Sequence, residues 1–132
     1  MDLEILEIAS NTENNKVVIN HTHSSRHKNA MCGDTMQVSL VIKKNIIREF
    51  GYQCKSCVYC QAAVSLLSRN SINKSTKSLK NLIKITENFF EKENFTFPKE
   101  WSVFKKLFKK KNIVRKECLK LPFKTLSKAL KK

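Results

Sequence analysis

The chain has 132 residues, and its 41% hydrophobic content is enough for one modest core but hardly for two. Its 26 Lys and Arg residues outnumber 11 Asp and Glu residues, which gives a formal net charge of +15 at pH 7. The uncharged apolar runs are far shorter than the roughly 20 residues of a membrane span, and the acidic start of the chain does not resemble a signal peptide. We therefore expect a single domain over residues 1–132 in the cytoplasm, with no membrane partner.

A charge of this size attracts phosphates and acidic proteins over long distances. The lysines are nevertheless spread over much of the chain, and the densest run, residues 105–111, alternates with core-type Leu107 and Phe108. We interpret this pattern as a solvated, lysine-rich surface, and we do not expect nucleic acid as a partner.

The beginning of the chain predicts a short helix and a first strand. Apolar residues recur at helical spacing over residues 3–9, and the turn-forming residues 11–15 end that pattern. Residues 16–19 are rich in β-branched side chains and predict a first strand, whereas the polar segment 21–29 predicts an irregular loop.

A strand hairpin is predicted next. Residues 35–43 alternate between apolar and polar side chains, as a half-buried strand does. Lys44 and Asn45 predict a hairpin turn, and residues 46–53 predict a third strand that pairs back on the second. Three strands of this kind predict a small antiparallel sheet.

The middle of the chain predicts two helices. Residues 61–69 are apolar on most sides and predict a buried helix, and residues 79–93 predict a helix with one apolar face. The polar segment 70–77 links them. Together with the strands, these helices predict an α+β fold in which a three-stranded antiparallel sheet is covered by helices.

Two more helices are predicted after the proline-containing break at residues 95–98. Residues 101–108 predict a short helix with an aromatic face. The last helix should begin close to Cys118, because Pro122 is tolerated only in a first helical turn. A thiol at a helix N-terminus meets the positive end of the helix dipole, which favours the thiolate. We therefore expect Cys118 to act as a ligand or a nucleophile.

The cysteines and one aspartate are the candidates for chemistry. The five thiols are Cys32, Cys54, Cys57, Cys60 and Cys118. An odd number of cysteines in a short chain suits a reduced compartment better than a disulfide framework. Three thiolates and one carboxylate are suited to a tetrahedral site for zinc or an iron-sulfur cluster. Asp34, the hard ligand among soft ones, is expected to be the most easily exchanged.

Three short motifs follow one another along the chain. Asn29-Ala30-Met31-Cys32-Gly33-Asp34 precedes the predicted hairpin, Cys57 opens a helix of small residues, and Arg115-Lys116-Glu117-Cys118 enters the last helix. In this order they resemble the NifU/IscU/SufU type of iron-sulfur cluster assembly scaffold, over residues 3 to 130. The resemblance implies a SufE/NifU-like α+β fold.

The resemblance also implies which thiols act together. Cys57 lies 25 positions after Cys32, close to the gap of the family, which implies Cys32, Cys57 and Cys118 as the thiolate ligands. Cys54 is the second candidate for the middle position. Cys60 is then a spare thiol, and Cys54 or Cys60 could take part in sulfur delivery.

The implied function is that of a carrier rather than an enzyme. A scaffold of this type builds an iron-sulfur cluster, which we expect to be [2Fe-2S], with sulfur from a cysteine desulfurase, and passes it to acceptor apoproteins. Two loops depart from the pattern, with Ala30 in place of a proline and Ser56 in place of a glycine. Glu117 stands where some scaffolds have a histidine, and 61 positions separate Cys57 from Cys118. The last two features are closer to the SufU branch.

Members of the SufU branch hold zinc and accept sulfur from a desulfurase. The alternative hypothesis is therefore a zinc-bound sulfurtransferase in which Cys118 leaves the metal and accepts the persulfide sulfur. A third hypothesis is a basic nucleic-acid-binding module with a structural zinc.

Overall fold

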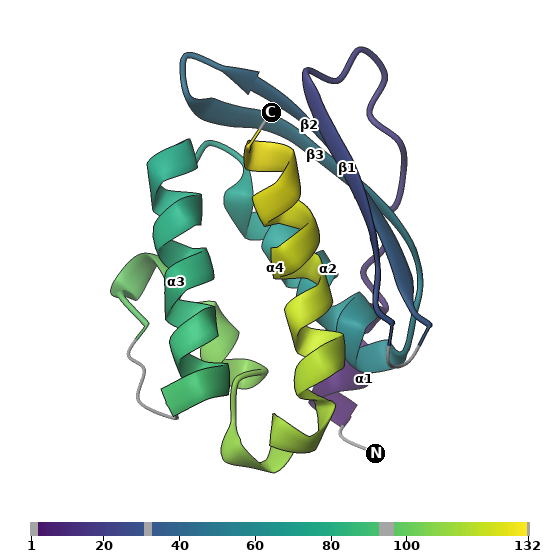
Figure 1. Ribbon diagram of the computed structural model, residues 1–132, viewed down its shortest axis with the longest axis vertical. Helices are drawn as coiled ribbons and strands as arrows, with labels where there is room; N and C mark the ends of the chain where they lie inside the picture. Colours follow the sequence, from purple (N-terminus) through teal and green to yellow (C-terminus); the bar gives the residue numbers. More distant parts are fainter. Residues whose placement is uncertain (1–2, 31–32, 93–96, 132) are drawn as a thin grey trace.

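The computed structural model describes residues 3–30, 33–92 and 97–131 (Figure 1). Its elements are α1 (Leu3–Ala9), β1 (His23–Lys28), β2 (Thr35–Lys43), β3 (Ile46–Lys55), α2 (Val58–Ser71), α3 (Thr76–Lys92), the 3-10 helices η1 (Lys99–Lys106) and η2 (Lys110–Arg115), and α4 (Lys116–Leu130). The strands form an antiparallel sheet in the order β1-β2-β3. The predicted α+β class, with a three-stranded antiparallel sheet and helices, is confirmed.

The β2–β3 hairpin has the predicted strands and turn. Lys44 and Asn45 have φ angles of 53° and 62°, the left-handed conformation that a tight two-residue hairpin turn requires. On β2, Met36, Val38 and Leu40 are buried beneath the helices, as the alternation predicts. This hairpin fixes where β2 begins and β3 ends, and therefore where the candidate ligands next to those strand ends lie.

The prediction of the first strand is wrong. Residues 16–19 are not a strand, and β1 lies instead at His23–Lys28, inside the segment predicted to be irregular. β1 is a polar edge strand in which Ser25 alone is classed as buried, so its sequence lacks the apolar alternation that marks a half-buried strand. Of residues 16–19 only Val18 is buried, and its backbone N–H donates to Ser39 Oγ across 2.9 Å, whereas Val17 and Ile19 are exposed.

The helices form two layers on one face of the sheet (Figure 1). α2 and α4 contact the strands, and α3 packs on α4 away from the sheet. The small and apolar residues of α2 are buried between the sheet, α1 and α4, as its sequence predicts. α2 begins at Val58, three residues before the predicted start, and this places Cys57 at its N-cap.

An aromatic cluster closes the far side of the helical layer. Trp101 and Phe104 of η1 are fully buried, and Phe104 lies 5.8 Å from Phe123 of α4 between ring centroids. Ring pairs at this separation favour edge-to-face and tilted arrangements. These contacts confirm that the predicted aromatic face of residues 101–108 belongs to the core.

The last helix differs from its prediction in one respect. α4 begins at Lys116, which makes Cys118 its third residue and confirms a start close to this thiol. Pro122 is then the seventh residue, outside the first turn. The predicted position of the proline is wrong because η2 runs directly into α4 and extends the helical backbone toward the N-terminus. None of the described helices is both long and apolar enough to cross a membrane.

Candidate metal centre

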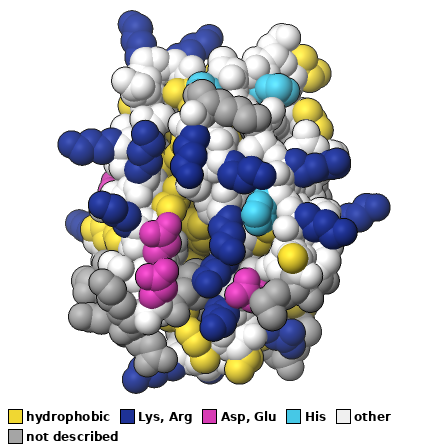
Figure 2. All heavy atoms as spheres, in the orientation of Figure 1, with side chains coloured by type: hydrophobic (Ala, Val, Ile, Leu, Met, Phe, Trp, Pro, Cys, Tyr) yellow, Lys and Arg dark blue, Asp and Glu magenta, His cyan; other side chains and the backbone are white. Residues whose placement is uncertain are grey.

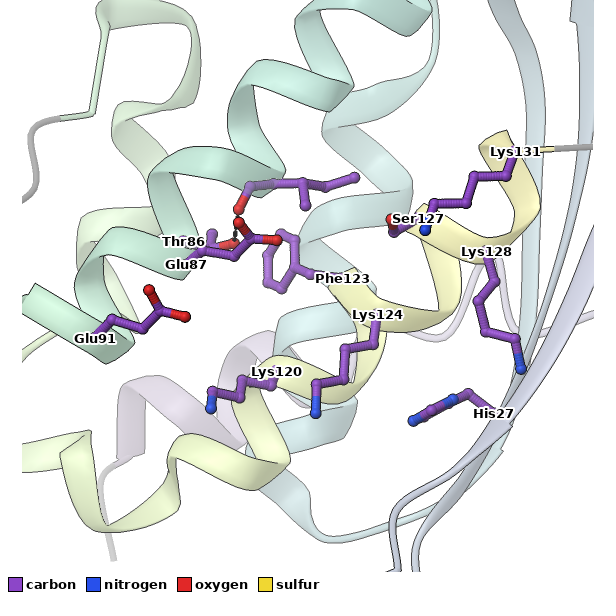
Figure 3. A pocket seen from close by; sticks show the side chains of 11 residues that line it. His27, Thr86, Glu87, Glu91, Lys120, Phe123, Lys124, Ser127, Lys128 and Lys131 are labelled. Atoms are coloured by element: carbon purple, nitrogen blue, oxygen red, sulfur yellow. Dashed lines mark hydrogen bonds between the residues drawn. The ribbon is translucent and has the colours of Figure 1, made fainter.

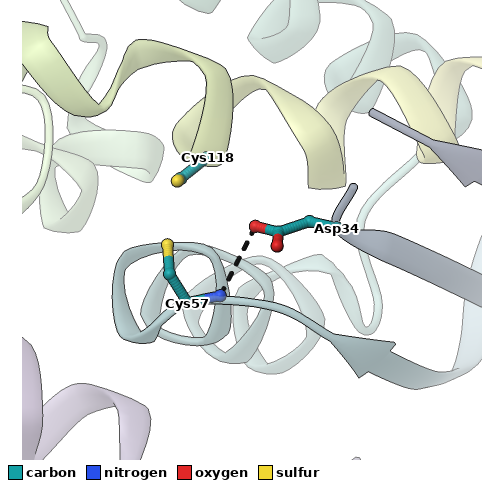
Figure 4. Close-up of side chains that lie close together, drawn as sticks. All are labelled: Asp34, Cys57 and Cys118. Atoms are coloured by element: carbon teal, nitrogen blue, oxygen red, sulfur yellow. Dashed lines mark hydrogen bonds between the residues drawn. The ribbon is translucent and has the colours of Figure 1, made fainter. Parts of the chain in front are cut away.

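Three chain segments that are distant in sequence meet at one end of the sheet. Asp34 ends the β1–β2 turn, Cys57 occupies the N-cap of α2, and Cys118 lies in the first turn of α4. The two sulfur atoms and a carboxylate oxygen of these side chains all lie within 4.8 Å of one another (Figure 4). Cys118 is buried, whereas Asp34 and Cys57 are partly exposed, so the group opens to solvent on one side.

Two backbone hydrogen bonds shape the turn that carries Asp34. The N–H of Gly33 donates to the carbonyl of Asn29, and the N–H of Asn29 donates to the carbonyl of Asp34, each across 2.8 Å. Gly33 has a φ angle of 76°, and a Cβ atom at this position would meet no atom of the described residues within 4 Å. The backbone conformation of the turn is therefore the reason that it favours glycine.

The Asp34 carboxylate also contacts the start of α2. Its Oδ2 atom accepts a hydrogen bond of 3.4 Å from the backbone N–H of Cys57, drawn in Figure 4. The N-terminal ends of α2 and α4 therefore both lie at the candidate centre, and their positive dipole ends favour negative charge there. This electrostatic setting suits a group of thiolates and a carboxylate.

Asn29 links the turn to α4. Its side-chain amide donates to the backbone carbonyl of Glu117 across 3.3 Å and lies 3.4 Å from the Glu117 carboxylate. Asn29 is buried, with 7% of its surface exposed. Since Glu117 precedes Cys118, this contact holds the turn of Asp34 and the first turn of α4 at a fixed separation.

A second contact joins the starts of α2 and α4. The Arg115 guanidinium lies 5.3 Å from the centroid of the Tyr59 ring, within the range of a cation–π interaction. Tyr59 follows Cys57 by two residues, and Arg115 directly precedes α4. Sequence reasoning assigned no role to Tyr59 and none to the Asn29 side chain, since neither residue is a metal ligand by type.

The remaining described thiols differ from this group. Burial raises the pKa of Cys60, which is fully buried in α2, and burial also raises the pKa of the partly buried Cys54. Cys54 lies within β3 opposite Met36 and is not part of the three-residue group. These positions favour Cys57 over Cys54 as the second ligand. Cys32, the remaining predicted ligand, lies outside the described residues.

The donor set fits a tetrahedral metal. Metal–sulfur bonds of about 2.3 Å place the ligand atoms of a tetrahedron about 3.8 Å apart. The 4.8 Å limit on the described group is about 1 Å wider, a difference that small side-chain rotations can close. Two soft thiolates and one hard carboxylate suit zinc as well as iron.

Comparison with known proteins identifies similar chains. Residues 2–130 match the family model described as the NifU-like N-terminal domain. An iron-sulfur cluster assembly scaffold protein, IscU of Thermotoga maritima, is 30% identical over 105 residues, which cover 80% of this chain and 74% of that protein.

Two solved structures share the fold. A protein described as an iron-sulfur cluster assembly scaffold for the SUF system, from Fervidobacterium islandicum, has a TM-score of 0.90 at 21% identity, over 98% of this chain and 96% of its own. The N-terminal part of a nitrogen-fixing NifU-like protein from Brucella abortus has a TM-score of 0.90 at 19% identity, over 98% and 91%.

Proposed function

Because this chain belongs to the family of NifU-like N-terminal domains, we propose that it is a scaffold on which an iron-sulfur cluster is assembled before transfer to acceptor apoproteins. The observation that carries this proposal is the group of Asp34, Cys57 and Cys118, whose ligand atoms lie within 4.8 Å of one another. Three segments separated in sequence converge to make this group. They are joined by the hydrogen bonds of Asp34 with Cys57 and of Asn29 with Glu117, and by the contact of Arg115 with the Tyr59 ring.

Each ligand has a distinct role in the proposal. Cys32, Cys57 and Cys118 hold the iron atoms as thiolates, and Cys32 is included because it lies two positions before Asp34 in the chain. Asp34 is the labile ligand, because a hard carboxylate binds iron less firmly than a thiolate in a sulfur-rich site. Its exchange opens a coordination position to the thiols of an acceptor protein.

The scaffold needs a source of sulfur and a destination for the cluster. We assign the supply to a cysteine desulfurase and the destination to apoproteins that take up a [2Fe-2S] cluster. The thiol-rich composition suits a reduced compartment, and the cytoplasm is the proposed location.

A zinc-bound sulfur acceptor is the second candidate function. It is supported by the same group of residues, since two thiolates, a carboxylate and one further ligand complete a zinc tetrahedron. In this function Asp34, Cys57 and Cys118 would hold zinc, which would keep the thiols deprotonated, and the Cys118 thiolate would attack the terminal sulfur of a persulfide on the desulfurase. The S–S bond of the donor breaks, its cysteine departs as a thiolate, and Cys118 becomes the persulfide.

Anaerobic reconstitution with iron and sulfide tests both functions. We expect a coloured, labile cluster in visible absorption and matching iron and sulfide contents by chemical assay. Tight zinc without a chromophore, together with persulfide on Cys118 after incubation with a desulfurase and cysteine, would establish the second function instead. Salt-sensitive binding of DNA or RNA that survives Cys32→Ser would support the nucleic-acid-binding hypothesis and contradict both.

A further inference from the structure

A groove runs between α3 and α4 on the side of α4 that faces away from the candidate centre. Its cavity has a volume of about 530 Å³ and is closed at one side by β1. Figure 3 shows basic side chains projecting from α4 and acidic ones from α3. The lining residues that the argument uses are His27, Glu87, Glu91, Lys120, Lys124 and Lys128.

The α4 side of the groove carries a row of lysines. Lys120, Lys124 and Lys128 are four residues apart and share one face of the helix, and Lys131 extends the row beyond its end. At a rise of 1.5 Å per residue the row is about 16 Å long, or three helical turns. Lys124 and Lys131 make no ion pair or side-chain hydrogen bond among the residues that the structure describes.

The α3 side is acidic, and the floor between the two sides is apolar. Glu87 and Glu91 lie one helical turn apart, and neither pairs with a described side chain. Ile83 of α3 and Phe123 of α4 lie beneath them, with Phe123 labelled in Figure 3. In cross-section the groove therefore has a cationic wall, an apolar floor and an anionic wall.

The positive field of the lysine row acts on a neighbouring side chain. The pKa of His27 is lowered by its burial and by the nearby charges of Lys128 and Lys124. The Lys128 ammonium also donates to the backbone carbonyl of Arg26 across 2.7 Å, which fixes it at the β1 side of the groove. On the face shown in Figure 2, the charged side chains are mostly Lys and Arg, with few acidic ones among them.

We propose that this groove binds an amphipathic helix of a partner protein, with acidic side chains facing α4, basic side chains facing α3 and an apolar ridge on the floor. Helix-in-groove recognition uses this arrangement of apolar anchors and flanking charges. Opposite charges on the two walls also specify the orientation of the bound helix. Three turns of helix match the length of the lysine row.

A nucleic acid fits this surface less well than a helix does. The phosphate backbone is uniformly negative, so a strand lying along the lysine row would place phosphates opposite Glu87 and Glu91. The apolar floor has no role in phosphate binding but accepts Leu or Ile side chains.

The test uses the full chain and a fluorescent synthetic peptide of 14 residues. The peptide has a leucine ridge, glutamates along one edge and lysines along the other, and a scrambled peptide of the same composition is the control. Binding is followed by fluorescence anisotropy at low and at physiological salt, and the bound surface is mapped by amide chemical shifts. We expect the designed peptide alone to bind, with shifts confined to α3, α4 and β1.

Charge-reversal variants make the test specific. Lys124→Glu with Lys128→Glu should weaken peptide binding at least tenfold. The control, Lys16→Glu with Lys43→Glu, makes the same change in net charge at exposed positions outside the groove, and it should alter peptide binding less than twofold. Glu87→Lys with Glu91→Lys should also weaken the binding of the peptide. Thermal unfolding of each variant confirms that the fold is retained.

Three results would overturn the proposal. The first is peptide binding that is absent, or equal in the groove and control variants. The second is binding of a labelled oligonucleotide of 20 thymidines that becomes tighter after Glu87→Lys with Glu91→Lys. This double substitution adds positive charge, which attracts phosphates but repels the lysine edge of the peptide. The third is a dimer of this chain, detected by sedimentation, that Lys124→Glu with Lys128→Glu abolishes.

Discussion

The side-chain amide of Asn29 donates a hydrogen bond of 3.3 Å to the backbone carbonyl of Glu117 and so connects two segments that carry candidate ligands. One segment ends in Asp34, and the other continues into Cys118. Cys57 and Cys118 are free thiols, so among the described residues the spacing of the ligands depends on contacts of this kind. In metal sites, residues that orient the ligands typically affect metal affinity by 10- to 100-fold.

Asn29→Ala should therefore weaken metal binding and lower stability together. We expect about tenfold weaker zinc or cobalt binding, in line with the loss of an orienting contact. The free energy of unfolding should fall by about 1–3 kcal/mol, because a carbonyl in a part-buried contact loses its donor. Chelator competition and urea unfolding measure the two effects.

Asn70→Ala is the matched control for this variant. The Asn70 amide also donates to a backbone carbonyl, that of Leu66 across 2.8 Å, but within α2 and away from the ligands. It should lower stability and leave metal affinity unchanged. Equal losses of metal affinity in the two variants would show that Asn29 has no orienting role.

Asp34→Ala should lengthen the lifetime of the assembled cluster and slow its transfer. The carboxylate is the ligand that exchanges most readily in the proposed site, and its removal closes the route by which acceptor thiols enter. Glu49→Ala removes an exposed carboxylate elsewhere on the sheet and serves as the control. Decay of visible absorption in air, and transfer to an apoferredoxin, measure the effect. An unchanged lifetime counts against the labile role of Asp34.

Substitution of the individual cysteines should distinguish the thiols that bind metal from those that do not. Cys57→Ser and Cys118→Ser should each abolish tight metal binding, whereas Cys54→Ser should retain it, because Cys54 lies outside the group of converging ligand atoms. Cobalt binding followed through thiolate-to-metal charge-transfer absorption tests this order. If Cys54→Ser removes the absorption and Cys57→Ser keeps it, the assignment of the second ligand is reversed.

Two glycines should respond differently to alanine. Gly33→Ala should cost about 1–2 kcal/mol through its left-handed backbone conformation, because its Cβ would meet no atom of the described residues within 4 Å. At Gly51 a Cβ would lie 2.5 Å from the Lys16 carbonyl oxygen and 2.8 Å from Val18 Cγ2, so Gly51→Ala must displace the segment over the sheet and should cost more. Urea unfolding measures both, and the opposite order would contradict this account of the turn and the sheet.

His27 should make stability fall as the solution is acidified. Its folded-state pKa is lowered from 6.5 by burial and by Lys128 and Lys124, so below pH 6.5 the unfolded chain binds more protons at this position than the folded chain. The contribution of His27 is therefore complete above that pH and is lost as the pH falls. In urea unfolding, the free energy of unfolding should rise with pH between about pH 5 and pH 7, and His27→Gln should reduce this dependence.

The lysines provide an internal check on the cause of this shift. Lys124→Gln with Lys128→Gln should raise the pKa of His27 toward 6.5, as measured from its ring signals by NMR. A His27 pKa that stays unchanged in this variant would assign the shift to burial alone.

Periodic apolar patterns made most of the fold predictable. The alternation over Thr35–Lys43 predicted the central strand. Helical spacing predicted α1 and α3, and the apolar content of residues 61–69 predicted α2, each within a few residues. The prediction missed β1 because this polar edge strand pairs with β2 through backbone hydrogen bonds, and its sequence has no alternation of apolar and polar residues. The position of Pro122 was missed because a 3-10 turn leaves no clear sequence signal.

The candidate ligands were predictable from short motifs, whereas their supports were not. The order of the motifs and the spacing of Cys57 from Cys32 named Asp34, Cys57 and Cys118 before the fold was known, although a free thiol taken alone is commonly just a small buried side chain. The hydrogen bond of Asn29 and the stacking of Arg115 on Tyr59 join residues far apart in sequence. Such contacts depend on how the β1–β2 turn and α2 lie against α4, which a single sequence does not reveal.

Pro122 interrupts the hydrogen bonds along α4 about one turn after Cys118, the residue of this helix that belongs to the candidate centre. Proline has no N–H, so it cannot donate the hydrogen bond that would otherwise latch its turn to the carbonyl of Cys118, four positions earlier. The core nevertheless holds the helix on both sides of this gap, since Leu119 and Leu121 are buried as fully as Phe123 and Leu126. Apolar contacts, more than the hydrogen bonds along the helix axis, therefore set the position of the turn that bears Cys118.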